Sequence, residues 1–376
     1  MEYRTFGKTG TKPSLLGFGC MRFPTKLDES GKRVIDRCEA EKMLDYAYNN
    51  GVTYFDTAYP YHGGESEVVL GNAMKKHKRD TFLVATKLPM WKLEKTEDVR
   101  AVFFEQLERL QMDYVDFYLL HALNRNTFKK GKDIHALEEV IKLKEEGRIK
   151  HIGFSFHDEY EIFEEIVNYY DWEFCQIQYN YMDTDVQAGV KGIRLCEEKG
   201  IPLVIMEPIM GGALAAFSED VEDLFKSYNK DASIASWALR FVASEDNVKV
   251  ILSGMSTFSQ VVDNINSFNK FTKLNEEEQK IIKKAKELIN SKIKIPCTGC
   301  SYCVPCPKGV KIPKNFYLWN NFGMYKNSSA KWEYNNMNDE EKASNCIKCG
   351  KCETLCPQHL EIRKNLSLLD EELSQR

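Results

Sequence analysis

The chain has 376 residues, and 52 Lys and Arg against 56 Asp and Glu give it a formal net charge of −4. A hydrophobic fraction of 43% and a charged fraction of 29% are ordinary for a globular protein, and the balanced charge predicts no nucleic-acid partner. No apolar run approaches the roughly 18–20 residues that cross a membrane, so we expect no membrane partner.

Eight short apolar segments alternate with helical patterns, which is typical of a parallel sheet built from βα units. These predicted strands lie at residues 14–19, 53–58, 82–88, 114–122, 149–156, 174–181, 202–208 and 249–255. The segments between them, such as 98–110 and 134–147, repeat apolar residues at intervals of three and four. Eight units in about 270 residues predict an α/β fold of the (β/α)8 TIM-barrel type. An open doubly wound sheet is the alternative, but no G-x-G-x-x-G follows the first strand.

Residues 275–290 predict one more exposed helix, and the composition changes after it. We therefore expect a barrel over residues 1–290 and a small Cys-rich domain over 291–376, either α+β or α-helical. The first residues, MEYRTFGKTG, lack the charged and then apolar pattern of a secretion signal, which predicts a cytoplasmic protein.

Four polar residues fall where predicted strands end, and active sites of TIM barrels lie at that edge. Asp56, Lys87 and His121 close the second, third and fourth strands, and Tyr61 follows in the loop after Asp56. Such a set suits carbonyl reduction, because hydride delivered to a carbonyl carbon leaves an alkoxide that needs a proton. Tyr61 would supply it if the Lys87 ammonium lowers its pKa from about 10. Asp56 would be the counter-charge of Lys87, and His121 would orient the carbonyl oxygen.

Several motifs resemble the aldo-keto reductase family: DTAYPYHGGESEVVLG (56–71), ATK (85–87), FYLLH (117–121), HIGFS (151–155), QIQYN (176–180) and SGMSTFSQVVDN (253–264). The resemblance covers about residues 1–270. It implies a (β/α)8 barrel, an NAD(P)H cofactor extended across the rim, and the tetrad Asp56, Tyr61, Lys87 and His121 in the roles given above. It further implies cofactor contacts at Gly19, Cys20, Met21, Asp56, Ser155, Gln178, Met206, Gly254, Thr257, Gln260 and Asn264.

The chain departs from that family at several of these positions. Phe156 replaces a frequent Asn, and Met206 stands where an aromatic residue stacks on the nicotinamide. Gly254 and Gln260 occupy positions where NADPH-selective members carry Lys and Arg for the 2′-phosphate. We therefore expect NADH to bind at least as well as NADPH. Glu207 adds a negative charge near the expected pyrophosphate path, or is turned to a local partner.

Eight of the twelve cysteines form two runs near the end of the chain. Cys346, Cys349, Cys352 and Cys356 followed by Pro357 fit the C-x2-C-x2-C-x3-C-P run of two-cluster ferredoxins, and Cys297, Cys300, Cys303 and Cys306 are one residue short of it. The ferredoxin pattern implies two [4Fe–4S] clusters with crossed ligation, in which Cys356 completes the first site and Cys306 the second. Two zinc sites are the alternative.

The two halves together resemble an aldo-keto reductase barrel fused to a ferredoxin-like domain. A nicotinamide gives up two electrons as hydride whereas a cluster accepts one, so a direct relay normally needs a flavin, and no flavin motif stands out. Three alternatives stay open for the cluster domain: exchange of electrons with a separate redox protein, a structural lid over the barrel mouth, or an electron carrier with the barrel as scaffold. Residues 318–336 would be a docking or lid surface, or the core of this domain.

The expected substrate is a small carbonyl compound or alcohol, with pocket walls from 90–98 and 122–133.

Overall fold

The computed structural model describes residues 1–325 and 328–374. The chain divides into two compact units. The first contains residues 1–211 and 236–274, and the second contains residues 212–235 and 275–376. The boundary predicted at residues 290 and 291 rests on composition and stays a prediction.

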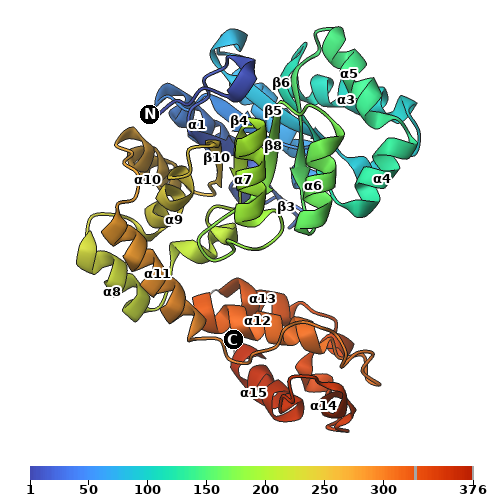
Figure 1. Ribbon diagram of the computed structural model, residues 1–376, viewed down its shortest axis with the longest axis vertical. Helices are drawn as coiled ribbons and strands as arrows, with labels where there is room; N and C mark the ends of the chain where they lie inside the picture. The colour runs from blue at the N-terminus through green and yellow to red at the C-terminus, as the bar shows by residue number, and fades with distance from the viewer. Residues whose placement is uncertain (326–327, 375–376) are drawn as a thin grey trace. The chain divides into compact units, whose positions relative to one another are not determined.

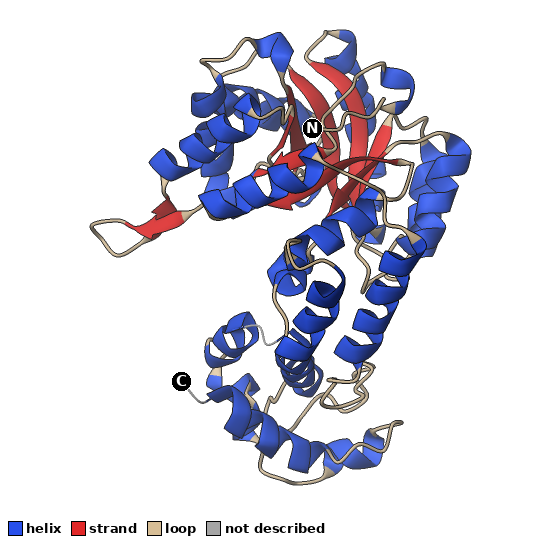
Figure 2. Cartoon of the chain, turned by 90° about the vertical axis from the view of Figure 1, so that its left-hand side faces the viewer, coloured by secondary structure: helices blue, strands red, loops and turns tan. Residues whose placement is uncertain are grey.

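A closed barrel of eight parallel strands forms the centre of the first unit. The eight predicted strands are all present, and the open doubly wound alternative is wrong, because β1 pairs with both β4 and β10 and leaves no free edge. Figure 2 shows these strands in red, surrounded by helices in blue. The strands are β1 Leu16–Gly19, β4 Tyr54–Asp56, β5 Leu83–Leu88, β6 Val115–Leu123, β7 Ile149–Phe156, β8 Phe174–Gln178, β9 Leu203–Met206 and β10 Val248–Gly254.

Amphipathic helices cover the outside of the barrel, as their apolar periodicity predicts. In α3 the buried residues Val99, Val102, Phe103 and Leu107 follow this spacing, and the helix has Glu97 and Asp98 in its first turn, where a helix dipole favours acids. The helices of this part of the chain are α1 Arg37–Asn49, α2 Glu65–Met74, α3 Glu97–Leu110, α4 Arg125–Asp133, α5 Ala136–Glu145, α6 Tyr160–Tyr169, α7 Gly189–Lys199, α9 Ile234–Ala243 and α10 Phe258–Asn269.

Side chains fill the barrel interior, so the barrel is a packed core rather than a pore. Phe6, from the segment before β1, packs its ring against Phe117 and Phe174 at centroid distances of 5.0 and 5.7 Å. Tyr54 and Val250 belong to the same buried cluster. This packing holds the strands in register and fixes where their carboxyl ends lie.

A short hairpin was not predicted. β2 Thr25–Leu27 and β3 Arg33–Ile35 pair antiparallel in a sheet of their own directly after β1. Asp28 closes its turn by accepting hydrogen bonds from the backbone of Ser30 and Lys32. The hairpin lies outside the barrel sheet (Figure 2).

The second unit is helical in its described residues, which decides between the α+β and α-helical predictions in favour of helices. α8 packs against α11, the helix predicted at 275–290, and an ion pair joins Asp220 to Lys292 at 2.6 Å. Around the cysteine runs, a separate core contains Phe316, Trp319 and Leu369. The helices are α8 Glu219–Tyr228, α11 Glu276–Asn290, α12 Ile312–Tyr325, α13 Ser328–Asn335, α14 Lys351–Leu355 and α15 Ile362–Ser374 (Figure 1).

The segment 318–336 therefore belongs largely to α12 and α13, apart from residues 326 and 327, which lie outside the described residues. Trp319 and Tyr334 are buried in the core of this unit, whereas Trp332 is 69% exposed. Most of its aromatic character is thus core packing. Within the described part of the chain, no helix is both long enough and apolar enough to cross a bilayer.

Candidate functional site

Lys87 and Asp56 form a buried ion pair at the carboxyl-terminal edge of the barrel. β4 ends at Asp56, and Lys87 is the residue before the last of β5. Lys87 Nζ donates to Asp56 Oδ1 at 2.6 Å and to the carbonyl oxygen of Thr57 at 2.8 Å. It also donates to the Tyr61 hydroxyl at 3.4 Å. An ammonium has three hydrogens, so these contacts use all of them and fix its direction.

Tyr61 and His121 lie next to each other beside this ion pair. Tyr61 begins a short 3-10 helix after β4, and His121 is on β6. Their ring centroids are 6.1 Å apart in an edge-on arrangement, and Trp91 lies over His121 at 5.0 Å. The tetrad predicted from the sequence is thus brought together in one place. Within the described residues His121 Nδ1 and Asp56 Oδ2 are buried without a hydrogen-bond partner.

Burial and charge set the protonation of these groups. Burial lowers the pKa of Lys87, but attraction by Asp56 and Tyr61 more than reverses this, so the pKa is raised and the ammonium stays charged. Burial raises the pKa of Tyr61, and Lys87 lowers it by less. The net shift is upward, opposite to our expectation. Burial, then the charges of Lys87 and His157, hold the pKa of His121 well below its ordinary value, so the imidazole is neutral.

A buried hydrogen-bond network connects β5 to the helices α2 and α3 that cover it. The Gln106 amide, on α3, donates to the carbonyl oxygen of Lys87 at 3.1 Å and to Glu67 Oε1 at 2.8 Å. Tyr118 donates to Gln106 Oε1 at 2.7 Å, and Thr86 donates to Glu67 at 2.6 Å. A fully satisfied buried network of this kind rigidifies its surroundings, so it positions the backbone that carries Lys87.

The other predicted cofactor contacts lie at strand ends on the same edge of the barrel. Gly19, Gln178, Met206 and Gly254 are the last residues of β1, β8, β9 and β10, with Ser155 one residue from the end of β7. Cys20 and Met21 follow β1, and Thr257, Gln260 and Asn264 belong to the start and first half of α10. Cys20 is fully buried whereas Met21 is 57% exposed. These residues therefore lie at the same edge of the barrel as the tetrad. Their contacts with a cofactor stay predictions.

Several of these side chains already have protein partners. Gln178 donates to Asp183 at 3.1 Å and accepts from Gln187 at 2.9 Å. Ser155 Oγ accepts from the backbone N–H of Ala122 at 2.8 Å, and among the described residues its own hydrogen has no acceptor, so it can be donated to a ligand. Asn264 donates to Ser253 Oγ at 2.8 Å.

Thr257 and Gln260 form the reciprocal capping box of α10. Thr257 Oγ1 accepts from the backbone of Gln260, and Gln260 Oε1 accepts from the backbone N–H groups of Ser256 and Thr257 at 2.8 and 3.2 Å. These bonds give both residues a structural role at the helix start. The one carbonyl oxygen of Gln260 is engaged in the cap.

Arg22 is a cation at this edge that the sequence analysis missed. It ends the 3-10 helix after β1, and a Cβ atom added to Gly254 would lie 3.2 Å from its Cγ and Cδ atoms. A Cβ atom on Gly211, after β9, would lie 3.0 Å from its Nη2 atom. Ser256 Oγ donates to the Arg22 carbonyl oxygen at 2.8 Å. Arg22, which follows β1, therefore lies beside the end of β10 and the loop after β9, and only the closed barrel brings these segments together.

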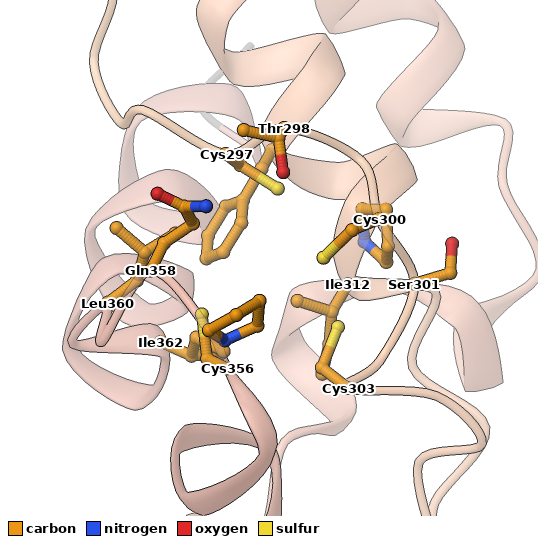
Figure 3. A pocket seen from close by; sticks show the side chains of 13 residues that line it. Cys297, Thr298, Cys300, Ser301, Cys303, Ile312, Cys356, Gln358, Leu360 and Ile362 are labelled. Carbon is orange, nitrogen blue, oxygen red and sulfur yellow. The ribbon is translucent and has the colours of Figure 1, made fainter.

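The cysteine runs of the second unit line two cavities. Cys297, Cys300, Cys303 and Cys356 line the first, with apolar neighbours that include Ile312. Figure 3 shows these four side chains around one central space, with their sulfur atoms facing it. The chain thus brings the last cysteine of the second run to the first three cysteines of the first run.

The second cavity is lined by Cys306, Cys346, Cys349 and Cys352. Cys303 also borders it, so this residue lies between the two cavities. Among the described residues, no three His, Cys, Asp or Glu side chains converge tightly enough to hold a single metal ion. The donor set, four soft thiolates around a space lined by apolar groups, fits an iron–sulfur cluster.

Comparison with known proteins supports the same interpretation of both units. The model of the aldo/keto reductase family matches residues 15–287. The chain belongs to the aldo/keto reductase family. A second model, described as a 4Fe-4S dicluster domain, matches residues 296–360. The protein is therefore an oxidoreductase of this family with a C-terminal 4Fe-4S domain.

Three curated relatives are similar to this aldo/keto reductase. "Probable aldo-keto reductase 1" of Glycine max is 28% identical over 55% of this chain and 59% of its own length. L-galactose dehydrogenase of Arabidopsis thaliana is 26% identical over 74% of this chain and 92% of its own. The NADH-specific methylglyoxal reductase of Escherichia coli is 25% identical over 59% of this chain and 80% of its own length. Among solved structures, the aldo-keto reductase AKR11C1 from Bacillus halodurans in its holo form matches with a TM-score of 0.62 and 26% identity, covering 76% of this chain and 96% of that one.

Proposed function

We propose that this aldo/keto reductase reduces the carbonyl group of a small molecule to an alcohol, or oxidises the alcohol, with Tyr61 as the proton donor or acceptor. The observation that carries the proposal is the contact of Lys87 Nζ with both Asp56 and the Tyr61 hydroxyl, beside neutral His121. A charged donor on the phenol stabilises the phenolate that remains after proton transfer. The relatives named as a methylglyoxal reductase and a sugar dehydrogenase act on small carbonyl compounds or alcohols, as their names say.

Each tetrad residue has one task in this mechanism. A bound reduced nicotinamide supplies the hydride. Tyr61 donates its hydroxyl proton to the substrate oxygen, and the neutral imidazole of His121 orients that oxygen by a hydrogen bond. Lys87 then holds the Tyr61 phenolate, and Asp56 keeps Lys87 charged and directed. Trp91, 49% exposed and packed on His121, forms one wall for the substrate.

The rim offers fitting groups for an NAD(P)H cofactor. The Gln176 Oε1 atom, on β8, is buried without a partner among the described residues, and Ser155 has a hydrogen to donate. These neutral groups suit the nicotinamide amide. Arg22 lies beside the loop after β9 and the end of β10, the seventh and eighth strands of the barrel, and phosphate sites of TIM barrels commonly lie after these strands. We assign Arg22 to the pyrophosphate, which both dinucleotides share, and expect NADH to bind at least as well as NADPH.

The second unit, in this proposal, holds two [4Fe–4S] clusters with crossed ligation. Cys356 completes the site of Cys297, Cys300 and Cys303, and Cys306 completes the site of Cys346, Cys349 and Cys352, in agreement with the two cavities. A bound cluster stores one electron. We propose that the clusters exchange electrons with a separate redox protein, since a structural role would not require two.

Anaerobic absorption spectra, combined with iron, sulfide, zinc and flavin analysis of the purified chain, test the composition. Two clusters require about eight iron and eight sulfide per chain. Zinc without sulfide would contradict the cluster proposal, and a bound flavin would add the two-electron to one-electron step that no motif predicts. Reduction of methylglyoxal and of small aldehydes with NADH tests the barrel, and failure with every carbonyl compound would contradict the reductase proposal.

A further inference from the structure

The surroundings of the two cysteine cavities differ in charge. The first cavity is lined by neutral residues only, with Thr298, Ser301 and Gln358 as its polar groups. No charged residue occurs between Cys297 and Pro307 in the sequence. The second cavity is lined by Lys351 and Arg363, and Lys348 stands in the same loop. Among the residues that line the two cavities, cations therefore occur only at the second.

Part of this positive charge is not compensated. Arg363 is paired with Glu353 at 2.7 Å, so it contributes little net charge to the surface. Lys308, Lys348 and Lys351 are exposed, and none of them has an ion pair within the described part of the chain. The carbonyl oxygen of Lys308 accepts a hydrogen bond at 2.6 Å from Asn345, the residue before Cys346, so Lys308 lies beside the second cysteine run. The loop that carries Lys348 and Lys351 has no acid between its first three cysteines.

This basic face also exposes a thiol and an apolar side chain. Cys349 is exposed, and Ile347, which lines the second cavity, is 57% exposed. An apolar centre with a charged rim is the usual composition of a protein interface. Electron transfer needs a cluster close to the surface where a partner docks, and Cys349 brings the second cavity to that surface. The first cavity also has an exposed thiol, Cys300, but lacks the cations.

We propose that the face formed by Lys308, Ile347, Lys348, Cys349 and Lys351 docks an acidic one-electron carrier protein, so that electrons enter or leave this enzyme at the second cluster site. The proposal rests on the proposed function of the clusters. In each encounter one electron passes between the cofactor of the carrier and the cluster, one of them being oxidised as the other is reduced, with no bond made or broken. Opposite charge on the two faces accelerates the encounter and selects the partner.

The test measures the affinity of the cluster-loaded full chain for a flavodoxin, as an acidic one-electron carrier, by anaerobic titration calorimetry. Cytochrome c serves as the basic carrier for comparison. The variant is Lys348→Glu, and the matched control is Lys283→Glu, which makes the same charge change at an exposed position of α11. Each titration is repeated at about 0.01 M and 1 M salt, where the screening length falls from about 30 to about 3 Å.

We expect Lys348→Glu to weaken flavodoxin binding about tenfold or more at low salt, with a much smaller effect at high salt. Lys283→Glu should change the affinity less than twofold. Equal affinity of Lys348→Glu and the parent, or tighter binding of cytochrome c than of flavodoxin by the parent, would overturn the proposal. Iron and sulfide content is measured for each protein, and if Lys348→Glu loses its clusters, Lys308→Glu replaces it with the same expected loss. Absence of clusters from the parent would instead contradict the proposed function.

Discussion

The ammonium of Lys87 lies 3.4 Å from the hydroxyl of Tyr61, and it is held in that direction by Asp56 rather than by solvent. Lys87 is fully buried and Tyr61 is half-buried, so the charge acts on the phenol at an effective dielectric constant well below that of water. The same shielding raises the pKa of Tyr61 above its ordinary value. The residue is thus protonated at neutral pH, as a donor must be, and its conjugate base has a cation beside it.

Removing the Tyr61 hydroxyl should abolish most of the reductase activity. Tyr61→Phe keeps the ring but removes the proton donor, so we expect kcat to fall about 10²–10⁴-fold with little change in cofactor affinity. The matched control is Tyr59→Phe, because the Tyr59 hydroxyl lies in the same loop but bonds to Glu105 and Lys92. Steady-state kinetics with NADH and a small aldehyde measure the change. Near-parent turnover in Tyr61→Phe would contradict the assignment.

The pH dependence should differ between the two directions of the reaction. Reduction needs protonated Tyr61. Because burial raises the pKa of Tyr61, the residue is fully protonated at neutral pH and loses its proton only as the pH rises through that raised pKa. We therefore expect reduction to stay constant from about pH 7 to 9 and to fall only above the ordinary tyrosine value of about 10. Alcohol oxidation needs the Tyr61 phenolate, so its rate should increase with pH until the pH exceeds the raised pKa of Tyr61. In Lys87→Met, both changes should move to higher pH, because Lys87 lowers the pKa of Tyr61. A shift to lower pH would contradict this role of Lys87.

Arg22 should contribute to the affinity for both dinucleotides equally. Arg22→Gln removes the guanidinium between Gly211 and Gly254, and losing one charged hydrogen bond of about 1.5–3 kcal/mol weakens binding by roughly 10-fold to 150-fold. Fluorescence titration with NADH and NADPH measures the affinity of the variant for each dinucleotide, with Arg33→Gln in the exposed hairpin as the control. Loss of NADPH affinity alone would move Arg22 from the pyrophosphate to the 2′-phosphate. A tenfold preference of the parent for NADPH would contradict the expected cofactor use.

Cys349→Ser separates the alternatives for the cluster domain. The change replaces a soft thiolate with a poor ligand at the second cavity. If the clusters are an electron relay, we expect the variant to lose exchange with a viologen while it keeps carbonyl reduction by NADH. A structural lid would instead raise the KM of carbonyl reduction. Anaerobic kinetics with both acceptors decide, and equal loss of both activities in a chain with parent-like circular dichroism would contradict the relay.

The Gln106 network should contribute to stability as well as position. Gln106→Leu leaves the buried Tyr118 hydroxyl without its acceptor and removes one donor from Glu67, which keeps its bonds from Thr86 and Arg109, and this costs about 1–3 kcal/mol of unfolding free energy. The control is Glu108→Leu on the same helix, where an exposed position should change stability by less than about 0.5 kcal/mol. Urea unfolding followed by circular dichroism measures both. Equal midpoints for the two variants would show that the network is not needed.

The barrel was predictable because its strands are buried on both faces and read as apolar runs, as in 114–122. The hairpin was not, since Thr25–Leu27 and Arg33–Ile35 are short, contain Lys26 and Arg33, and bury little. The tetrad was predictable because each of its members lies at, within two residues of, or just after the carboxyl end of a predicted strand. The position of Arg22 could not be predicted, because its neighbours Gly211 and Gly254 are remote in sequence and only barrel closure brings them close to it. The upward pKa shift of Tyr61 likewise depends on packing that no motif encodes.

The crossing of the cysteine runs has a consequence for how the protein is made. The first cavity needs Cys356, near the end of the chain, to join Cys297, Cys300 and Cys303. Its four thiols therefore cannot come together until Cys356, 53 residues after Cys303, has been synthesised. Any premature stop before Cys356 deprives the first site of a ligand even though its own run of four cysteines is intact. All eight barrel strands, by contrast, precede both runs, so such a stop removes a ligand from the first site and leaves every strand of the barrel in the chain.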